Sequence, residues 1–199
     1  MNILITLAII GIIAFGVWDW RDGSLDLPAK FSTNKYGSFL TQIKAKNLPF
    51  KILTPSYIPS GFKFLKADSA KLAQGVNIGI PQVNYLFASS DGKNGLALKQ
   101  FDKAIYQTTM AEVLKKTGFK DWPTFFAAQY KAKPIERGGQ TVYVRVPAEK
   151  VRSVLGDLQY IASAHLVNDD SVIELNYSGE AVFSEEELIK IVLALKPAK

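Results

Sequence analysis

The chain lacks cysteine altogether and has a single histidine, His165, among its 199 residues. Without cysteine it can form no disulfide bond and no thiolate site for zinc or an iron–sulfur cluster, and it has no thiol nucleophile. One histidine cannot build a histidine-rich metal centre, and no glycine loop has the spacing of a phosphate-binding motif. The sequence therefore predicts no metal site and no bound cofactor.

His165 is also the residue that any Ser-His-Asp site would have to use. It lies in a predicted strand between Ala164 and Leu166, and Ser163 would face the same side of that strand. A catalytic histidine needs an orienting carboxylate and a nucleophile within reach, and no motif supplies them. We therefore predict no catalytic residue and no enzyme activity. An enzyme would need polar groups that converge around His165, or a pair of acids in a cleft.

Two acidic segments could suggest a cation site. Asp169 and Asp170 are adjacent, and residues 91–95 (DGKNG) superficially resemble a calcium loop. Adjacent acids in a turn usually cap their own backbone, and the second segment lacks the acidic residue that a calcium loop carries further along. Both segments are interpreted as turns.

Basic residues outnumber acidic ones by 24 to 18, which gives a formal charge of +6. No known nucleic-acid-binding module is present, so we predict no nucleic-acid partner. Residues 29–75 hold eight lysines and one aspartate, a formal charge of +7. We predict that these lysines contact anionic headgroups or envelope polymers; the alternative is that they only keep the domain soluble and blunt sheet edges. The candidate contacts are Lys44, Lys46, Lys51 and Lys63.

One long apolar run stands near the N-terminus. Residues 3–18 (ILITLAIIGIIAFGVW) contain no charge and only Thr6 as a polar side chain. As a helix they would extend about 24 Å, slightly less than the roughly 30 Å hydrocarbon core of a bilayer. Trp18 and Trp20 are suited to the membrane interface. We therefore predict a transmembrane anchor at residues 1–20.

Two alternatives stay open for this run. Ala14-Phe15-Gly16 has the pattern of a signal-peptide cleavage site, although no Lys or Arg precedes the run; a buried core helix would suit its length but not its unbroken apolar character. By analogy with common anchors, we expect a single-pass protein of the cell membrane with its C-terminal domain outside the cytoplasm. The positive-inside rule applied to Arg21, Lys30 and Lys35 favours the reverse orientation.

Residues 21–34 are polar and are expected to form a linker to a single domain at 35–199. Two hairpins are predicted where Gly, Asn or Asp residues separate strand patterns, at 83–101 and at 158–177. The other predicted elements are a helix at 36–46, strands at 62–65 and 141–146, and two helices within 109–131, which belong to an insert at 105–134.

The last helix has the clearest pattern. Residues 184–187 (SEEE) match a capping box. Leu188, Ile191, Val192 and Leu195 follow at helical spacing, so they would cover the apolar face of an antiparallel sheet. The sequence thus predicts an α+β fold, a curved antiparallel β-sheet covered by helices, behind an N-terminal transmembrane helix.

Three motifs resemble the DUF4367 domain. Residues 55–62 (PSYIPSGF) are similar to its P-x-Y-x-P-x-G-[FY] opening, and residues 139–144 (GQTVYV) to its G-x-x-V-Y-V strand. Residues 184–191, after the strand at 173–175, resemble its final S-x-E-E-L-x-K-I helix. The resemblance covers residues 50–196 in patches.

This resemblance implies an extracytoplasmic part of a bacterial lipoprotein or an anti-sigma-factor-like membrane protein, with a curved antiparallel sheet and helices against it. The family carries no catalytic residues to transfer. The helical insert departs from the short form of the domain, and His165 stands where such domains often carry a tryptophan.

The insert contains four aromatic residues at helical spacing, Trp122, Phe125, Phe126 and Tyr130. They are interpreted either as a core face or as an exposed surface for a partner or lipid, since the insert exceeds what the domain core requires.

The sequence as a whole predicts a non-catalytic, membrane-anchored extracytoplasmic domain. Its expected role is interaction, sensing or service as an accessory subunit in a membrane-protein complex. The alternative is a carrier that binds an apolar or lipid-like ligand in the concave face of the sheet, which requires a continuous apolar cavity with a mouth.

Overall fold

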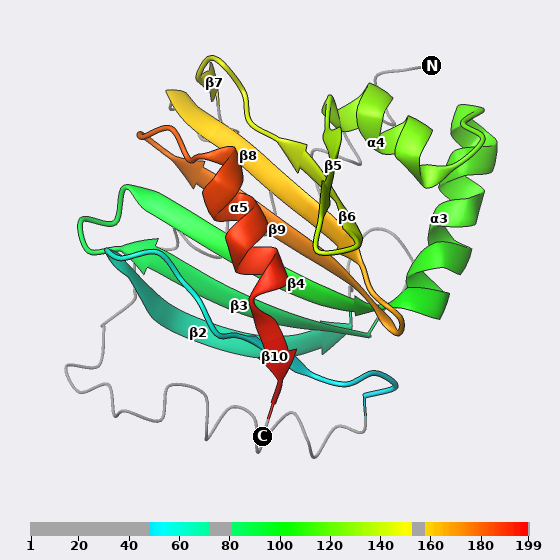
Figure 1. Cartoon of the computed structure of the whole chain (residues 1–199), viewed down its shortest axis with the longest axis horizontal. Helices are drawn as coiled ribbons and strands as arrows, with labels where there is room; N and C mark the ends of the chain where they lie inside the picture. The colour runs from blue at the N-terminus through cyan, green and yellow to red at the C-terminus, as the bar shows by residue number, and fades with distance from the viewer. Residues whose placement is uncertain (1–47, 72–80, 153–157, 199) are drawn as a thin grey trace.

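The computed structural model describes residues 48–71, 81–152 and 158–198. Its centre is an eight-stranded antiparallel sheet in the order β2-β3-β4-β9-β8-β6-β5, with β7 paired to β8 (Figure 1). The strands are β2 Phe62–Lys71, β3 Pro81–Ser89, β4 Asn94–Asp102, β5 Lys133–Arg137, β6 Gln140–Arg145, β7 Val151–Arg152, β8 Leu158–Val167 and β9 Ser171–Gly179. With helices packed on this sheet, the fold is α+β, as predicted.

A smaller ribbon crosses the sheet. It consists of β1 (Leu53–Pro55) and β10 (Leu195–Pro197), which pair antiparallel. Both predicted hairpins are present, as β3–β4 and β8–β9. Strand β9 lies between β4 and β8, so the two hairpins join into one sheet.

Helix α5 (Glu185–Leu193) covers one face of the sheet (Figure 1). Leu188, Ile191 and Val192 are buried against the strands, as their spacing predicts. The sheet contributes alternate residues to the same core, among them Val83, Tyr85, Phe87, Leu96, Leu98, Val144, Leu166, Ile173 and Leu175. This face is therefore a continuous apolar interface.

Two details of α5 differ from the prediction. Leu195 lies beyond the helix, in β10, because the chain leaves the helix after Leu193 and pairs with β1. The capping box is only half formed: Ser184 Oγ accepts a hydrogen bond from Glu187 N at 3.1 Å. The Glu187 carboxylate instead accepts one from the Tyr57 hydroxyl at 2.6 Å. It thereby ties the segment after β1 to the helix.

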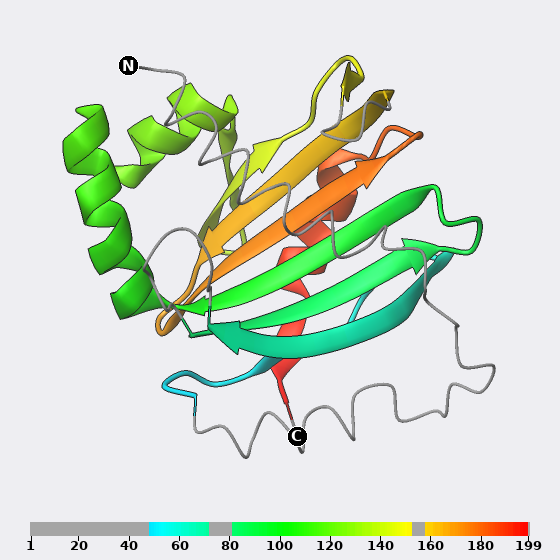
Figure 2. The same ribbon diagram turned by 180° about the vertical axis from the view of Figure 1, so that it is seen from behind.

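Helices α3 (Lys103–Thr117) and α4 (Trp122–Tyr130) pack against one end of the other face (Figure 2). The first helix begins before the predicted start at residue 109, because the Asp102 carboxylate accepts a hydrogen bond from Ile105 N at 2.7 Å. Strand β5 begins at Lys133, inside the predicted helical insert, because it pairs along its length with β6.

Several predictions fall on residues outside the described ranges. They are the transmembrane anchor with Trp18 and Trp20, the linker, the helix at 36–46, and the candidate contacts Lys44 and Lys46. Within the part of the chain that is described, no helix is both long enough and apolar enough to cross a bilayer.

Candidate binding cleft

A cleft of about 820 Å³ opens at the end of the sheet where two strand turns meet. The β5–β6 and β8–β9 turns form its rim, the start of α4 forms a wall, and β1 and β10 contribute from the α5 side. Its lining is mixed. Leu53, Trp122, Tyr143, Val167 and Leu195 supply apolar surface, whereas Lys51, Gln140, Thr141, Asn168, Asp169 and Asp170 supply polar groups.

The β8–β9 turn is held in place by its backbone and by two neighbouring elements. Asn168 N donates to Ser171 O at 2.8 Å. The Asp170 carboxylate accepts a hydrogen bond from Lys51 N at 3.3 Å, which ties the turn to the segment before β1. Lys103 Nζ, at the start of α3, donates to Asn168 O at 3.0 Å. The turn is therefore fixed from both sides of the sheet.

The β5–β6 turn lies beside it. Gly138 and Gly139 have φ angles of 57° and 76°, in the left-handed region that favours glycine. The next residue, Gln140, donates from Nε2 to Asn168 Oδ1 at 3.3 Å. This contact links the two turns, so their polar side chains form one continuous rim.

Trp122 is positioned by helix α4 and by the aromatic residues around it. The Asp121 carboxylate caps the helix by accepting from Thr124 N at 2.9 Å, and this bond lowers the pKa of Asp121. The Trp122 ring lies 5.8 Å from that of Tyr106 and 5.6 Å, edge to face, from that of Phe125. The Trp122 side chain is thus half-buried, and the neighbouring aromatic rings hold its orientation.

Charged groups of both signs lie around the cleft. Asp169 and Asp170 are exposed on the rim, and Lys51 is exposed beside them. Lys103 lies next to the same turn, where its ammonium group donates to the backbone of Asn168 and Asp169. Among the described residues that line the cleft, one lysine therefore stands beside two aspartates, so the lining carries charges of both signs with a small acidic excess.

A row of polar residues crosses the face of the sheet that carries α3 and α4. Asn84, Lys99, Glu174, His165 and Tyr143 are partners in register on β3, β4, β9, β8 and β6. Because alternate residues face opposite sides of a strand, all five point away from α5. This face therefore carries a polar row beside buried apolar residues such as Phe101 and Val172, whereas the face under α5 is apolar throughout its core.

His165 lies within this row and beneath helix α4. It is 4% exposed, and its ring packs 5.6 Å from that of Tyr130. Burial lowers the pKa of His165, and the neighbouring Glu174 carboxylate offsets part of the shift. The same carboxylate accepts a hydrogen bond from Tyr106 at 2.9 Å, and burial together with Glu174 raises the pKa of Tyr106. A neutral histidine therefore lies under the helix rather than in the cleft.

No protein-family model matches the chain, and no curated protein matches it. Among solved structures, it is similar to a crystal structure from Bacteroides thetaiotaomicron VPI-5482. The two are 13% identical, with a TM-score of 0.39, and the match covers 75% of this chain and 48% of the other. This chain thus spans about half the length of that protein. A likeness this distant assigns no function, and the resemblance to DUF4367 stays a prediction.

The four aromatic residues of the insert do not share one surface. Phe125 is fully buried, so for this residue the core interpretation is correct and the partner surface is wrong. Tyr130 packs against Phe125 and His165. Trp122 is partly exposed and lines the cleft. The side chain of Phe126 lies outside what the structure describes.

The candidate lysines are also separated. Lys51 is exposed at the cleft, near Asp170. Lys63 is exposed at the opposite end of the sheet, where it pairs with Ala88 beside the β3–β4 turn. These two lysines therefore do not form one patch.

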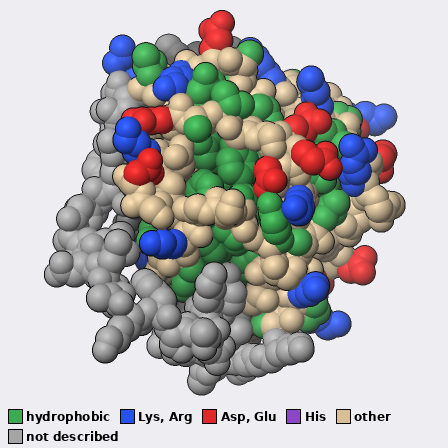
Figure 3. Space-filling model, turned by 60° about the vertical axis from the view of Figure 1, so that its left-hand side comes forward, with side chains coloured by type: hydrophobic (Ala, Val, Ile, Leu, Met, Phe, Trp, Pro, Cys, Tyr) green, Lys and Arg blue, Asp and Glu red, His purple; other side chains and the backbone are tan. Residues whose placement is uncertain are grey.

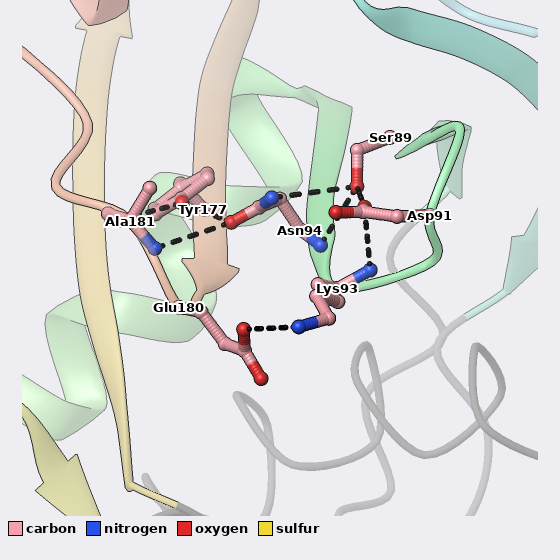
Figure 4. A network of polar contacts seen from close by, with 7 residues as sticks. All are labelled: Ser89, Asp91, Lys93, Asn94, Tyr177, Glu180 and Ala181. Carbon is pink, nitrogen blue, oxygen red and sulfur yellow. Dashed lines mark hydrogen bonds and ion pairs between the residues drawn. The ribbon is translucent and has the colours of Figure 1, made fainter.

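The segment that resembled a calcium loop is a structural turn (Figure 4). Asp91 accepts hydrogen bonds from Ser89 Oγ and from Lys93 N. Lys93 forms a 3.0 Å ion pair with Glu180, which links the turn to the segment after β9. Since these groups bond to one another, the interpretation as a turn is confirmed. Within the described ranges, no cluster of three or more acidic or histidine side chains could hold a metal ion.

The exposed apolar surface is a further feature (Figure 3). Hydrophobic side chains form a band across this side of the molecule, with charged groups of both signs around it. In the described chain, Val182 and Leu158 are the most exposed large apolar side chains, at 60% and 56%.

Sequence reasoning missed Gln140, Tyr143 and Asn168 as members of a site. Gln140 follows a Gly-Gly pair, and Asn168 precedes two aspartates, so both carried the signal of a turn. A turn pattern in the sequence does not indicate which turns lie side by side in the folded protein.

Proposed function

We propose that this protein is a single-pass membrane protein whose α+β domain acts outside the cytoplasm as a non-catalytic binding domain. Its role is that of a sensing or accessory subunit, and its ligand or partner binds in the cleft at the end of the sheet. The cleft carries this proposal, because three elements distant in sequence present a fixed polar rim around partly exposed aromatic and aliphatic side chains.

Two further observations support binding rather than catalysis. The described residues that line the cleft do not include His165, which is buried under α4. The two aspartates of the rim are exposed, and Asp170 accepts a hydrogen bond from the backbone. A general acid or base instead needs a reacting group within hydrogen-bond reach, whereas the Asp170 carboxylate is already bonded to the Lys51 amide.

The carrier alternative has less support. The face under α5 is filled with packed apolar side chains, and the other face presents Lys99, Glu174 and Asn84. A lipid-like ligand on that face would lie against charged and amide groups that its apolar chain cannot bond.

Membrane topology can be tested because the chain has no cysteine. Lys120→Cys places a single thiol at an exposed position between α3 and α4. We expect a membrane-impermeant maleimide to label it in intact cells. Asn2→Cys is the matched control, expected to react only after the membrane is opened. The reverse pattern would contradict the proposed orientation, and a cleaved N-terminus would contradict the anchor.

Binding at the cleft can be tested by photo-crosslinking in native membranes. A photo-reactive phenylalanine analogue in place of Gln140 would lie on the rim of the cleft. The same analogue in place of Glu149, an exposed residue in the segment before β7, serves as the control. We expect a discrete crosslinked product from position 140 only. Identical products at both positions, or none at either, would contradict a binding role for the cleft.

A further inference from the structure

We propose that the cleft binds a neutral saccharide, an inference that rests on its proposed role as a binding site. Sugar rings present an apolar face of C–H groups and a periphery of hydroxyls. A site for them therefore needs aromatic surface beside planar hydrogen-bonding side chains, with little net charge. The described lining of this cleft meets each of these requirements.

Trp122 and Tyr143 provide the aromatic surface. Both are partly exposed, both line the cleft, and both belong to one cluster around the buried Phe125. Trp122 is further supported by the Tyr106 ring at 5.8 Å. Its orientation is set before a ligand arrives, so little conformational entropy is lost when a sugar ring stacks on it.

Asn168, Asp169 and Gln140 provide the hydrogen-bonding groups. Carboxylates accept hydrogen bonds, whereas side-chain amides both donate and accept, so together they match hydroxyl groups that also do both. The two turns that carry these residues are joined by the 3.3 Å bond from Gln140 to Asn168. The β8–β9 turn is also anchored by Lys103. The donors and acceptors are therefore preorganised.

Charge and size favour a neutral ligand of this kind. Asp169 and Asp170 repel an anion, and Lys51 beside them offsets part of their attraction for a cation, so a neutral ligand meets the smallest Coulombic penalty. The volume of about 820 Å³ lies within the usual range of small-molecule sites and leaves room for more than one sugar ring.

Trp122 allows a direct test, because the chain has only three tryptophans. In the full chain, Trp18→Phe and Trp20→Phe leave Trp122 as the only tryptophan. The protein is held in a detergent without a sugar headgroup and titrated with maltotriose, cellotriose and chitotriose. At about 10 mM a site with a Kd near 1 mM is roughly 90% occupied. We expect a saturable change in emission with at least one of these trisaccharides.

Gln140→Ala removes one rim group from an exposed position. It should weaken that binding about fivefold, the effect of one hydrogen bond. Gln107→Ala makes the same change on the exposed side of α3 and should leave binding unaltered. Parallel titrations with triglutamate and trilysine should give no saturable response.

The results of these experiments distinguish an envelope polymer from a free oligosaccharide as the ligand. They also distinguish a failure of the saccharide inference from a failure of the proposed binding function. Retention on amylose, cellulose or chitin resin in addition to trisaccharide binding supports an envelope polymer; trisaccharide binding alone supports a free oligosaccharide. If no trisaccharide binds, if a charged peptide binds more tightly, or if Gln140→Ala has no effect, the saccharide inference is wrong. A crosslinked protein from position 140 without saccharide binding would leave the proposed function standing. Absence of both would overturn both.

Discussion

A single buried histidine can make the free energy of unfolding depend on pH even where it has no catalytic role. His165 lies between the Tyr130 ring and its strand partners Glu174 and Tyr143. Burial is the main cause of its lowered pKa, so the folded protein holds it neutral. The unfolded chain gains a proton at this residue at a higher pH than the folded chain does.

We predict that the free energy of unfolding falls as the pH drops below about 6.5, the ordinary pKa of histidine. In this window the unfolded state binds more protons than the folded state, so stability rises with pH; the contribution stops changing below the lowered folded pKa. Urea unfolding followed by circular dichroism between pH 8 and 5 measures the slope. His165→Gln should flatten it and leave the cellular function intact. Equal slopes in both proteins would contradict the assignment.

Gly179 illustrates a second effect at this scale. A Cβ at this position would clash with Asn94 Oδ1 and with the Tyr177 hydroxyl. Asn94 Oδ1 accepts a hydrogen bond from that hydroxyl at 2.7 Å and another from Ala181 N at 3.4 Å (Figure 4). A methyl group at Gly179 therefore displaces the amide that joins β4 to the segment after β9.

We predict that Gly179→Ala lowers the free energy of unfolding by about 1–3 kcal/mol, as overpacking does. In the Asn94→Ala background two of the three close atoms are gone and only the Tyr177 hydroxyl still obstructs the methyl group, so the same change should cost less. A double-mutant cycle by chemical denaturation measures this coupling. Gly92→Ala, in the neighbouring turn, tests for left-handed strain alone, because nothing lies within 4 Å of its Cβ. Strictly additive losses at Asn94 and Gly179 would contradict the steric argument.

Elements defined by local signals could be predicted from the sequence. The β3–β4 and β8–β9 hairpins have turn residues between alternating runs, and α5 has a capping serine before an amphipathic stripe. Strand β5 could not be predicted, because its five residues are mostly exposed and only its pairing with β6 makes it a strand. The same holds for Leu195, whose helical spacing is overridden by the pairing of β10 with β1.

Helix α5 is the element on which the apolar face depends. We predict that Leu188→Ala or Ile191→Ala lowers the free energy of unfolding by about 2–4 kcal/mol each, since both side chains are fully buried and each would leave a cavity. Chemical denaturation of the purified full chain measures the loss. Glu185→Ala, at an exposed position in the first turn of the same helix, should cost far less. A loss within experimental error for both core variants would mean that the helix is peripheral to stability.

At the scale of the molecule, the cleft could not be predicted from the sequence even though several of its residues could. Trp122 and the Asp169–Asp170 pair were separate candidates, and Lys51 belonged to a basic segment. They meet because β9 inserts between β4 and β8, which brings the β8–β9 turn beside α3 and β1. No periodicity within a segment encodes such long-range pairing.

The positions of two candidate lysines change the expectation for the basic segment, residues 29–75. Lys51 and Lys63 lie at opposite ends of the sheet, so they cannot bind an anionic surface as one local patch. Any attraction must come from the summed charge of residues 29–75, which is +7. Such an attraction is long-ranged in low salt and strongly screened in high salt.

We predict that residues 29–199, without the anchor, sediment with anionic lipid vesicles at low ionic strength and are released at high ionic strength. The reason is that the Debye length falls from about 10 Å at 0.1 M salt to about 3 Å at 1 M. Replacing Lys44, Lys46, Lys51 and Lys63 by Gln should abolish binding and leave the circular dichroism spectrum unchanged. Lys51→Gln or Lys63→Gln alone should weaken it only partly, because neither side chain defines a patch. Zwitterionic vesicles are the control, and a fragment that ignores anionic vesicles even at low salt would show that these lysines serve solubility alone.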